Sequence, residues 1–163
     1  MGYQQERLEL TIEWFAGFFE AEGWVSLMKT HRMYKGKKRI MFVPVCGMCN
    51  TDFKILEGIK QLLEKYSIIY QLHLRGKRKK SHKESWQINM QAYERAMRFL
   101  EWIIPYMRSE KKEKAEKILE FCKTRKLKTC SGWDGVPYSE EDYKLYEEIS
   151  SKILNDYTPN AER

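Results

Sequence analysis

The stretch L-E-L-T-I-E-W-F-A-G-F-F-E-A-E-G (Leu8–Gly23) decides the fold of this chain. It has the length of a helix, its interior contains no proline, and Gly23 at its end is a typical helix stop. Glycine inside a helix costs about 0.5–1 kcal/mol relative to alanine, so Gly17 needs a reason. Gly17 and Ala21 share one face, and small side chains there would let a second backbone approach closely. Glu22 lies at the end of this helix, one residue before the break.

The end of this stretch, F-A-G-F-F-E-A-E-G (Phe15–Gly23), resembles the signature of the LAGLIDADG homing endonucleases. The agreement covers Ala16, Gly17, both acidic positions and Gly23. The chain departs from the signature in Phe for the leading Leu and in Glu for Asp at both acidic positions. The longer Glu side chain makes the geometry of a metal site less certain than the identity of its ligand.

The resemblance implies a paired helix. In the family two such helices pack side by side through their small residues, which here places Ala16, Gly17, Glu20 and Ala21 in a dimer interface. Glu20 is two residues from Glu22 and points elsewhere on a helix, so its role is expected to be structural or interfacial. The chain holds one copy of the motif, which implies a homodimer and a near-palindromic target.

The resemblance also implies a metal site. Glu22 and the backbone carbonyl of Ala21 would bind Mg²⁺, or Mn²⁺ or Ca²⁺ in its place. The family has a lysine near the metal in a K-x-x-x-A pattern, which Lys111 matches, with Lys112 as the neighbouring candidate. The implied catalytic residues are therefore Glu22 and Lys111. A glutamine often found at the end of the second strand corresponds roughly to Cys49, which leaves the water network of the site open.

Composition indicates one domain with an anionic partner. The chain has 163 residues and a net charge of +7, which favours nucleic acid first and a membrane surface second. It has no apolar run of membrane-spanning length and no N-terminal signal pattern. We expect a single domain over residues 1–163, with a core at about 8–126 and a helical extension at about 127–157. The expected location is the cytoplasm, or an organelle in a eukaryotic host.

The four cysteines predict reduced thiols. Cys46-x-x-Cys49 has the spacing of half a zinc site, but Cys122 and Cys130 do not form a matching second pair. The first pair also falls in a predicted strand, where residues three apart point to opposite faces. We therefore expect four reduced thiols, most of them buried.

Hydrophobic periodicity predicts an α+β fold with the order α-ββ-α-ββ-α and further C-terminal helices. Strands are predicted at 24–30, 40–49, 68–75 and 85–91, and helices at 8–23, 53–66, 92–105, 109–126 and 139–155. Two hairpins with one buried face each make a curved four-stranded antiparallel sheet backed by helices. The register of 40–49 is open: if Met41, Val43 and Val45 face the core, the outward face is also apolar, and Pro44 indicates a bulge or an edge.

The other sheet face predicts binding to double-stranded DNA. Amides, arginine and hydroxyls on an antiparallel ribbon can read base edges in the major groove, and basic loops hold phosphates. A solvated sheet face is also polar, but two basic loops on one sheet favour nucleic acid. The predicted strand contacts are Ser26, Met28, Thr30, Gln71, His73, Arg75, Ser85, Gln87 and Asn89. The predicted loop contacts are Arg32, Lys35, Lys37, Lys38, Arg39, Lys77, Arg78, Lys79 and Lys80.

By resemblance, the chain is expected to be a homodimeric, Mg²⁺-dependent, site-specific DNA endonuclease that makes a staggered double-strand break and is encoded within a mobile intron. Two alternatives share the fold. One is an RNA maturase that binds intron RNA and assists splicing, because a basic sheet suits structured RNA as well. The other is a DNA-binding protein without catalysis, which retention of Glu22 and Lys111 disfavours.

Overall fold

The computed structural model describes residues 9–75, 83–128 and 137–156. The elements follow the predicted order: α1 (Ile12–Glu22), β1 (Gly23–Tyr34), β2 (Lys37–Asn50), α2 (Phe53–Lys65), β3 (Gln71–Arg75), β4 (Ser85–Gln91), α3 (Tyr93–Ile103), the 3-10 turn η1 (Ile104–Tyr106), α4 (Lys111–Lys128) and α5 (Glu140–Asp156). The strands form a four-stranded antiparallel sheet in the order β1-β2-β4-β3. The α+β prediction is therefore confirmed.

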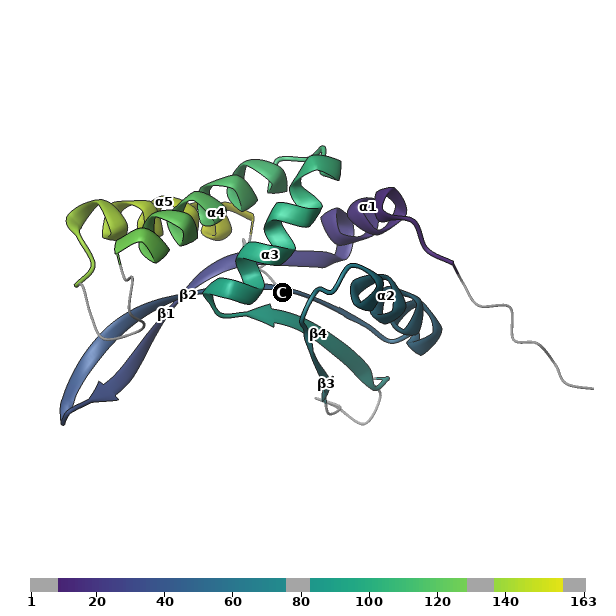
Figure 1. Cartoon of the computed structure of the whole chain (residues 1–163), viewed down its shortest axis with the longest axis horizontal. Helices are drawn as coiled ribbons and strands as arrows, with labels where there is room; N and C mark the ends of the chain where they lie inside the picture. The colour runs from purple at the N-terminus through teal and green to yellow at the C-terminus, as the bar shows by residue number, and fades with distance from the viewer. Residues whose placement is uncertain (1–8, 76–82, 129–136, 157–163) are drawn as a thin grey trace, which may run out of the picture.

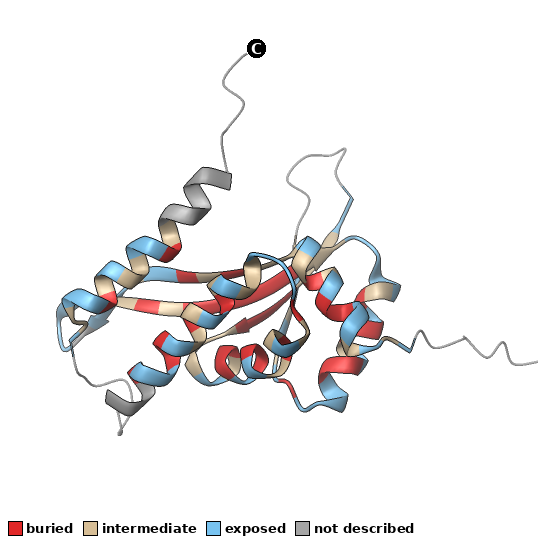
Figure 2. Ribbon diagram, turned by 90° about the horizontal axis from the view of Figure 1, so that it is seen from above, coloured by how far each residue is buried: buried red, intermediate tan, exposed pale blue. Residues whose placement is uncertain are grey.

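The helices lie on one face of the sheet, and the two hairpins arch away from them at opposite ends of the molecule (Figure 1). Buried residues gather where the helices meet the sheet (Figure 2). One core cluster joins α1, the strands and the C-terminal helices, with Phe15, Phe99 and Ile149 among its members. None of the helices in the described ranges is long and apolar enough to cross a membrane. The face opposite the helices, called the open face below, is left uncovered by them (Figure 1).

Helix α1 is shorter than predicted at its start. It begins at Ile12 because the Thr11 side chain caps it, accepting a hydrogen bond from the Trp14 amide at 3.2 Å. The first hairpin is longer than predicted. Its basic residues continue the strands up to a two-residue turn at Lys35 and Gly36, whose φ values of 46° and 75° are typical of a type I′ turn.

The pairing with β1 decides the register that the sequence leaves open for the second strand, and Met41, Val43 and Val45 do not face the core. Val25 and Leu27 of β1 face the helices, and they pair with Cys46 and Pro44 of β2. Residues directly opposite in a ladder share a face. Phe42 and Cys46 are accordingly fully buried on the helix side, whereas Met41, Val43 and Val45 lie on the open face.

Pro44 occupies a local edge and not a bulge. Its carbonyl accepts the amide of Ala92 at 3.2 Å, just past the last β2–β4 pair at Val45 and Gln91. The N and O of one strand residue point to the same side, so the missing N–H of Pro44 faces the side where β4 has ended. The ladder with β1 therefore continues unbroken through Pro44.

Helix α2 has a side-chain cap at its start and buries the middle of its apolar stripe. The Asp52 side chain accepts the Lys54 amide at 2.9 Å, which caps the helix. Phe53 at the start of the helix and Tyr66 just after its end are exposed, whereas Leu56, Ile59, Leu62 and Leu63 are buried.

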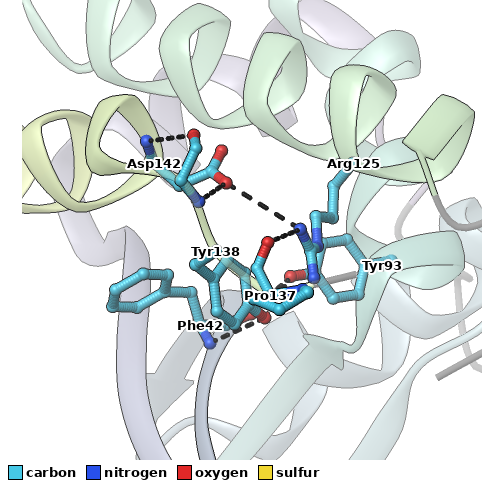
Figure 3. Close-up of polar contacts among 7 residues, drawn as sticks. Phe42, Tyr93, Arg125, Pro137, Tyr138 and Asp142 are labelled. Carbon is cyan, nitrogen blue, oxygen red and sulfur yellow. Dashed lines mark hydrogen bonds and ion pairs between the residues drawn. The ribbon is translucent and has the colours of Figure 1, made fainter. Parts of the chain in front are cut away.

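Beyond the end of β4, two tyrosine hydroxyls replace the missing strand beside β2 (Figure 3). The Tyr93 hydroxyl donates to the Phe42 carbonyl at 2.7 Å, and the Phe42 amide donates to the Tyr138 hydroxyl at 3.1 Å. The two hydroxyls are 3.1 Å apart, and Tyr138 is the donor because Tyr93 has used its proton. Burial raises the pKa of Tyr93, so that proton stays in place.

The segment before α5 holds Tyr138 in this position. The Arg125 guanidinium lies 4.1 Å from the centre of the Tyr138 ring, donates to the Pro137 carbonyl at 3.3 Å, and lies 3.8 Å from the Asp142 carboxylate (Figure 3). Ser139 and Asp142 form a capping box at the start of α5, with bonds of 2.8 and 3.2 Å. The C-terminal extension is thereby fixed to the first hairpin. Residues 129–136 before it lie outside the described residues.

Candidate functional site

The C-terminal end of α1 carries the predicted metal ligand. Glu22 is the last helical residue and is exposed. Among the described residues, its carboxylate takes part in no hydrogen bond or ion pair. Gly23 follows because a Cβ there would lie 2.3 Å from the Phe19 ring, which only glycine avoids. The chain then enters β1 directly, so Glu22 stands where the sheet begins.

Lys111 caps this end of α1. Its ammonium donates to the carbonyls of Phe19, Glu20 and Gly23, at 3.1, 2.6 and 2.5 Å. These bonds use the three N–H donors of the ammonium and oppose the negative end of the helix dipole. Burial lowers the pKa of Lys111, while the charges of Glu20 and Glu22 act in the opposite direction. Lys111, and not its neighbour Lys112, is therefore the lysine brought to Glu22.

Glu20 connects α1 to the start of α4. One of its carboxylate oxygens accepts the backbone amides of Arg108 and Ser109, at 2.7 and 2.5 Å. Burial opposes the charge, but the bonds from Ser109 and Arg108 and the nearby Lys111 outweigh it and lower the pKa of Glu20. The structural half of the expectation for Glu20 fits this position. These contacts lie within one chain.

The outer face of α1 is open at the predicted small residues. Gly17 and Ala21 are exposed, and a Cβ added at Gly17 would meet nothing within 4 Å. Nothing within the described part of the chain therefore requires glycine at this position. Trp14, 42% exposed, stacks on Phe18 beside it, with ring centres 5.2 Å apart. The expectation for Ala16 needs correction, because Ala16 is fully buried in its own core and cannot lie on this face.

The open face of the sheet collects most of the predicted DNA contacts. The β1–β2 register places Ser26, Met28, Thr30 and Arg32 there, opposite Val45, Val43, Met41 and Arg39. The register of the other strands adds Gln71, His73 and Arg75 of β3 opposite Asn89, Gln87 and Ser85 of β4. Lys37 shares this face, opposite Tyr34, and Lys35 lies in the turn.

Two predicted contacts need correction. Lys38 pairs with Met33 on the side of the sheet that faces the helices, because the strand alternation continues to the turn. Asn89 is 9% exposed, and its side-chain oxygen accepts a bond from Gln87 at 2.8 Å. It lies with Trp24 over Gly47, where a Cβ would be 2.4 Å from the Asn89 oxygen. Asn89 thus supports Gln87. Lys77, Arg78, Lys79 and Lys80 lie outside the described residues.

The predicted DNA contacts leave out Met41, Val43, Val45 and Cys49 of β2, which lie on the open face. The sequence leaves the face of the first three open, and it offers Cys49 only as half of a possible zinc site and as the counterpart of a family glutamine. Cys49 lies 4.0 Å from an Arg75 guanidinium nitrogen. A two-residue turn at 35–36 would have predicted their position, because the length of the turn fixes which β2 residues lie on the same face as Met28.

The thiols are placed as expected for reduced cysteines. Cys46 faces the helices and Cys49 the open face, so the pair cannot bind one metal ion from one side of the strand. Burial raises the pKa of Cys46, and it raises the pKa of Cys122 to about 12. These two thiols stay protonated at neutral pH, which makes them poor metal ligands. Cys130 lies outside the described residues.

The sequence matches the family model described as "LAGLIDADG-like domain" over residues 9–104. The chain belongs to the LAGLIDADG family. The match begins just before α1 and ends in η1, so it covers the helix with Glu22 and the whole sheet. A comparison with curated protein sequences found no significant match.

Solved LAGLIDADG structures share the fold. The homing endonuclease I-TnaI superposes with a TM-score of 0.61 at 12% identity, covering 92% of this chain and 100% of that one. I-CvuI bound to the I-CreI target with Mg superposes with a TM-score of 0.53 at 16% identity, covering 85% of this chain and 94% of that one. I-GzeII, also bound to DNA, gives 0.55 at 14% identity, but the match covers only 49% of its chain and 91% of this one. The chain thus matches about half the length of I-GzeII.

The donor atoms at the end of α1 suit a hard divalent cation. A carboxylate and a backbone carbonyl are oxygen ligands of the kind that Mg²⁺ and Ca²⁺ prefer. Lys111 binds the carbonyls of Phe19, Glu20 and Gly23 and leaves that of Ala21 aside. The described ranges contain no group of three or more His, Cys, Asp or Glu side chains placed to hold a metal. Among the described residues, the Glu22 carboxylate and the Ala21 carbonyl are therefore the oxygen atoms that this end of α1 could offer to such a cation.

Proposed function

We propose that this chain is a site-specific endonuclease that hydrolyses phosphodiester bonds in double-stranded DNA with a divalent cation. The observation that carries the proposal is the position of Glu22, an exposed carboxylate that makes no hydrogen bond or ion pair within the described chain. It stands where α1 leads directly into the polar open face. The family membership and the DNA-bound relatives support the same substrate class.

The active form is proposed to be a homodimer. The exposed, unobstructed face around Gly17 would let a second α1 pack closely, and that packing would bring two Glu22 carboxylates together. A two-fold dimer presents the same open face twice, so its target should be a near-palindrome. Trp14 and Phe18 would supply apolar area at the edge of this contact.

Each residue has a proposed part in the chemistry. Glu22 and the Ala21 carbonyl would hold the cation, which when bound would activate water and neutralise the leaving oxygen. Lys111 would act as a positioning residue, because its bonds fix the end of α1 from which Glu22 projects. Glu20 would hold α4 and its Lys111 in place through the amides at 108–109. The arginine and lysine residues at the tip of the first hairpin would bind phosphates.

Cleavage of a randomised DNA library with Mg²⁺ and with EDTA tests this proposal. The unmutated chain should cut a defined subset of the library only in Mg²⁺. Glu22→Gln should abolish cutting and leave binding of the recovered duplex near normal, whereas Glu57→Gln on the exposed side of α2 should leave both unchanged. Cutting by Glu22→Gln would show that the site is assigned wrongly. Binding without cutting by the unmutated chain would favour the DNA-binding alternative, and selective binding of intron RNA over duplex DNA would favour the maturase.

A further inference from the structure

The first hairpin carries an apolar patch in the middle of an otherwise polar and basic surface. Met28, Met41 and Val43 lie together on the open face, with Met28 directly opposite Val43. Met28 is 39% exposed, and the other two are half-buried. We call these three residues the apolar patch. They cannot contribute to the core beneath the helices, because the strand alternation turns them to the other side.

The surroundings of the apolar patch match those of a DNA-contacting surface. Toward the hairpin tip the same face presents Arg32 opposite Arg39. Toward α1 it presents Ser26. The second hairpin, by contrast, offers hydrogen-bonding groups such as Gln87 and Arg75 on this face. The patch is therefore flanked by groups that bind phosphates and polar base edges, and it differs from them in chemistry.

The major groove of DNA has one apolar feature, the 5-methyl group of thymine. We infer that the apolar patch recognises thymine methyl groups in the DNA target, an inference that rests on the proposed function. Methionine and valine offer no strong hydrogen-bond donor or acceptor for a base edge, so contact with a methyl group is the discrimination that they can supply. Uracil in RNA lacks this methyl group, which makes the patch unsuited to the maturase's substrate.

The position of the patch locates the thymines. Met28 lies five residues along β1 from Gly23, which follows the end of α1. Met41 pairs with Thr30, which lies seven residues from Gly23. At about 3.3 Å per residue these are roughly 17 and 23 Å along the strand, and DNA rises about 3.4 Å per base pair. The contacted thymines should therefore lie about five to seven base pairs from the end of α1.

Deoxyuridine substitution tests the inference. The duplex recovered best from a randomised pool by binding in Ca²⁺ is resynthesised with deoxyuridine in place of each thymidine in turn. Loss of one buried methyl group should weaken binding of the unmutated chain about fourfold at one or more thymines in the predicted segment. Thymines elsewhere in the duplex should tolerate the change.

Two variants on the patch and one matched control complete the test. Met28→Ser and Val43→Ser remove the apolar side-chain groups of the patch and should reduce the deoxyuridine penalty to less than twofold. Met33→Ser changes a methionine on the opposite face of the same strand, 65% exposed, and should retain the full penalty. A recovered duplex that tolerates deoxyuridine everywhere, or an unchanged penalty in both patch variants, would overturn this inference alone. A pool without any preferred duplex would overturn the proposed function and this inference with it.

Discussion

Lys111 is predicted to hold the end of α1 in place, and its replacement should destabilise the whole fold. Lys111→Met removes the ammonium that bonds to the Phe19, Glu20 and Gly23 carbonyls at 2.5–3.1 Å. A hydrogen bond to a charged group contributes about 1.5–3 kcal/mol. The partial loss of water around the half-buried ammonium offsets part of what the three bonds contribute together. We expect the free energy of unfolding to fall by about 3 kcal/mol, which in a chain of this size lowers Tm by roughly 6–12 °C.

Urea unfolding of matched variants measures this effect. Lys112→Met changes the adjacent residue, whose ammonium makes no hydrogen bond or ion pair within the described chain, and should alter the free energy of unfolding by less than about 0.5 kcal/mol. Lys111→Arg keeps the charge and should lie between the unmutated chain and Lys111→Met. Equal stabilities for Lys111→Met and Lys112→Met would refute the capping role, and would leave Lys111 as a residue that serves chemistry alone.

Three further outcomes are expected. Tyr138→Phe removes the hydroxyl that accepts the Phe42 amide and should lower the free energy of unfolding by about 1–2 kcal/mol. Tyr143→Phe, the control, should leave the free energy of unfolding nearly unchanged. Equal losses in the two variants would contradict a stabilising role for the Tyr138 hydroxyl. Gly17→Leu should convert a dimer to a monomer in sedimentation velocity, and an unmutated chain that sediments as a monomer would count against the pairing of α1. Because the folded-state pKa of Glu20 is lowered from 4.5, its stabilisation should be present above that pH and be lost as pH falls through the lower folded value. Glu20→Gln should flatten that part of the stability–pH curve.

Element order and most strand faces could be predicted because the periodicity of the sequence is clear there. The strands around Ser26, His73 and Gln87 alternate polar and apolar residues, so burying the apolar side leaves one choice of face. The predicted site at the end of α1 depended on residue types rather than on periodicity. The place of Glu22 as the last residue of its helix followed from Gly23 alone.

The second strand could not be predicted in the same way, because both of its faces are apolar. One face carries Phe42 and Cys46, and the other carries Met41 and Val43. Burying either face would remove apolar surface from water, so hydrophobic burial hardly favours one register over the other. Only the pairing partner decides, and that partner depends on the turn at 35–36. The apolar patch was hidden by this ambiguity.

Contacts between distant residues were equally out of reach of local patterns. Lys111 lies 88 to 92 positions from the carbonyls that it binds, and Tyr138 lies 96 positions from Phe42. Such bonds depend on how α4 and α5 dock on the sheet, which no local spacing encodes. A lysine in a charged helix and a tyrosine in a glycine-rich segment look like surface residues until that docking is known.

A mixed dimer shows whether both Glu22 carboxylates are needed to break both DNA strands. The unmutated chain and the Glu22→Gln chain carry different tags and are refolded together. The mixed dimer is purified through both tags and incubated with the recovered duplex in Mg²⁺. If each chain contributes one Glu22 carboxylate, the unmutated dimer breaks both strands and the mixed dimer makes no double-strand break. Double-strand breaks by the mixed dimer at the rate of the unmutated dimer would rule out a site built from both chains.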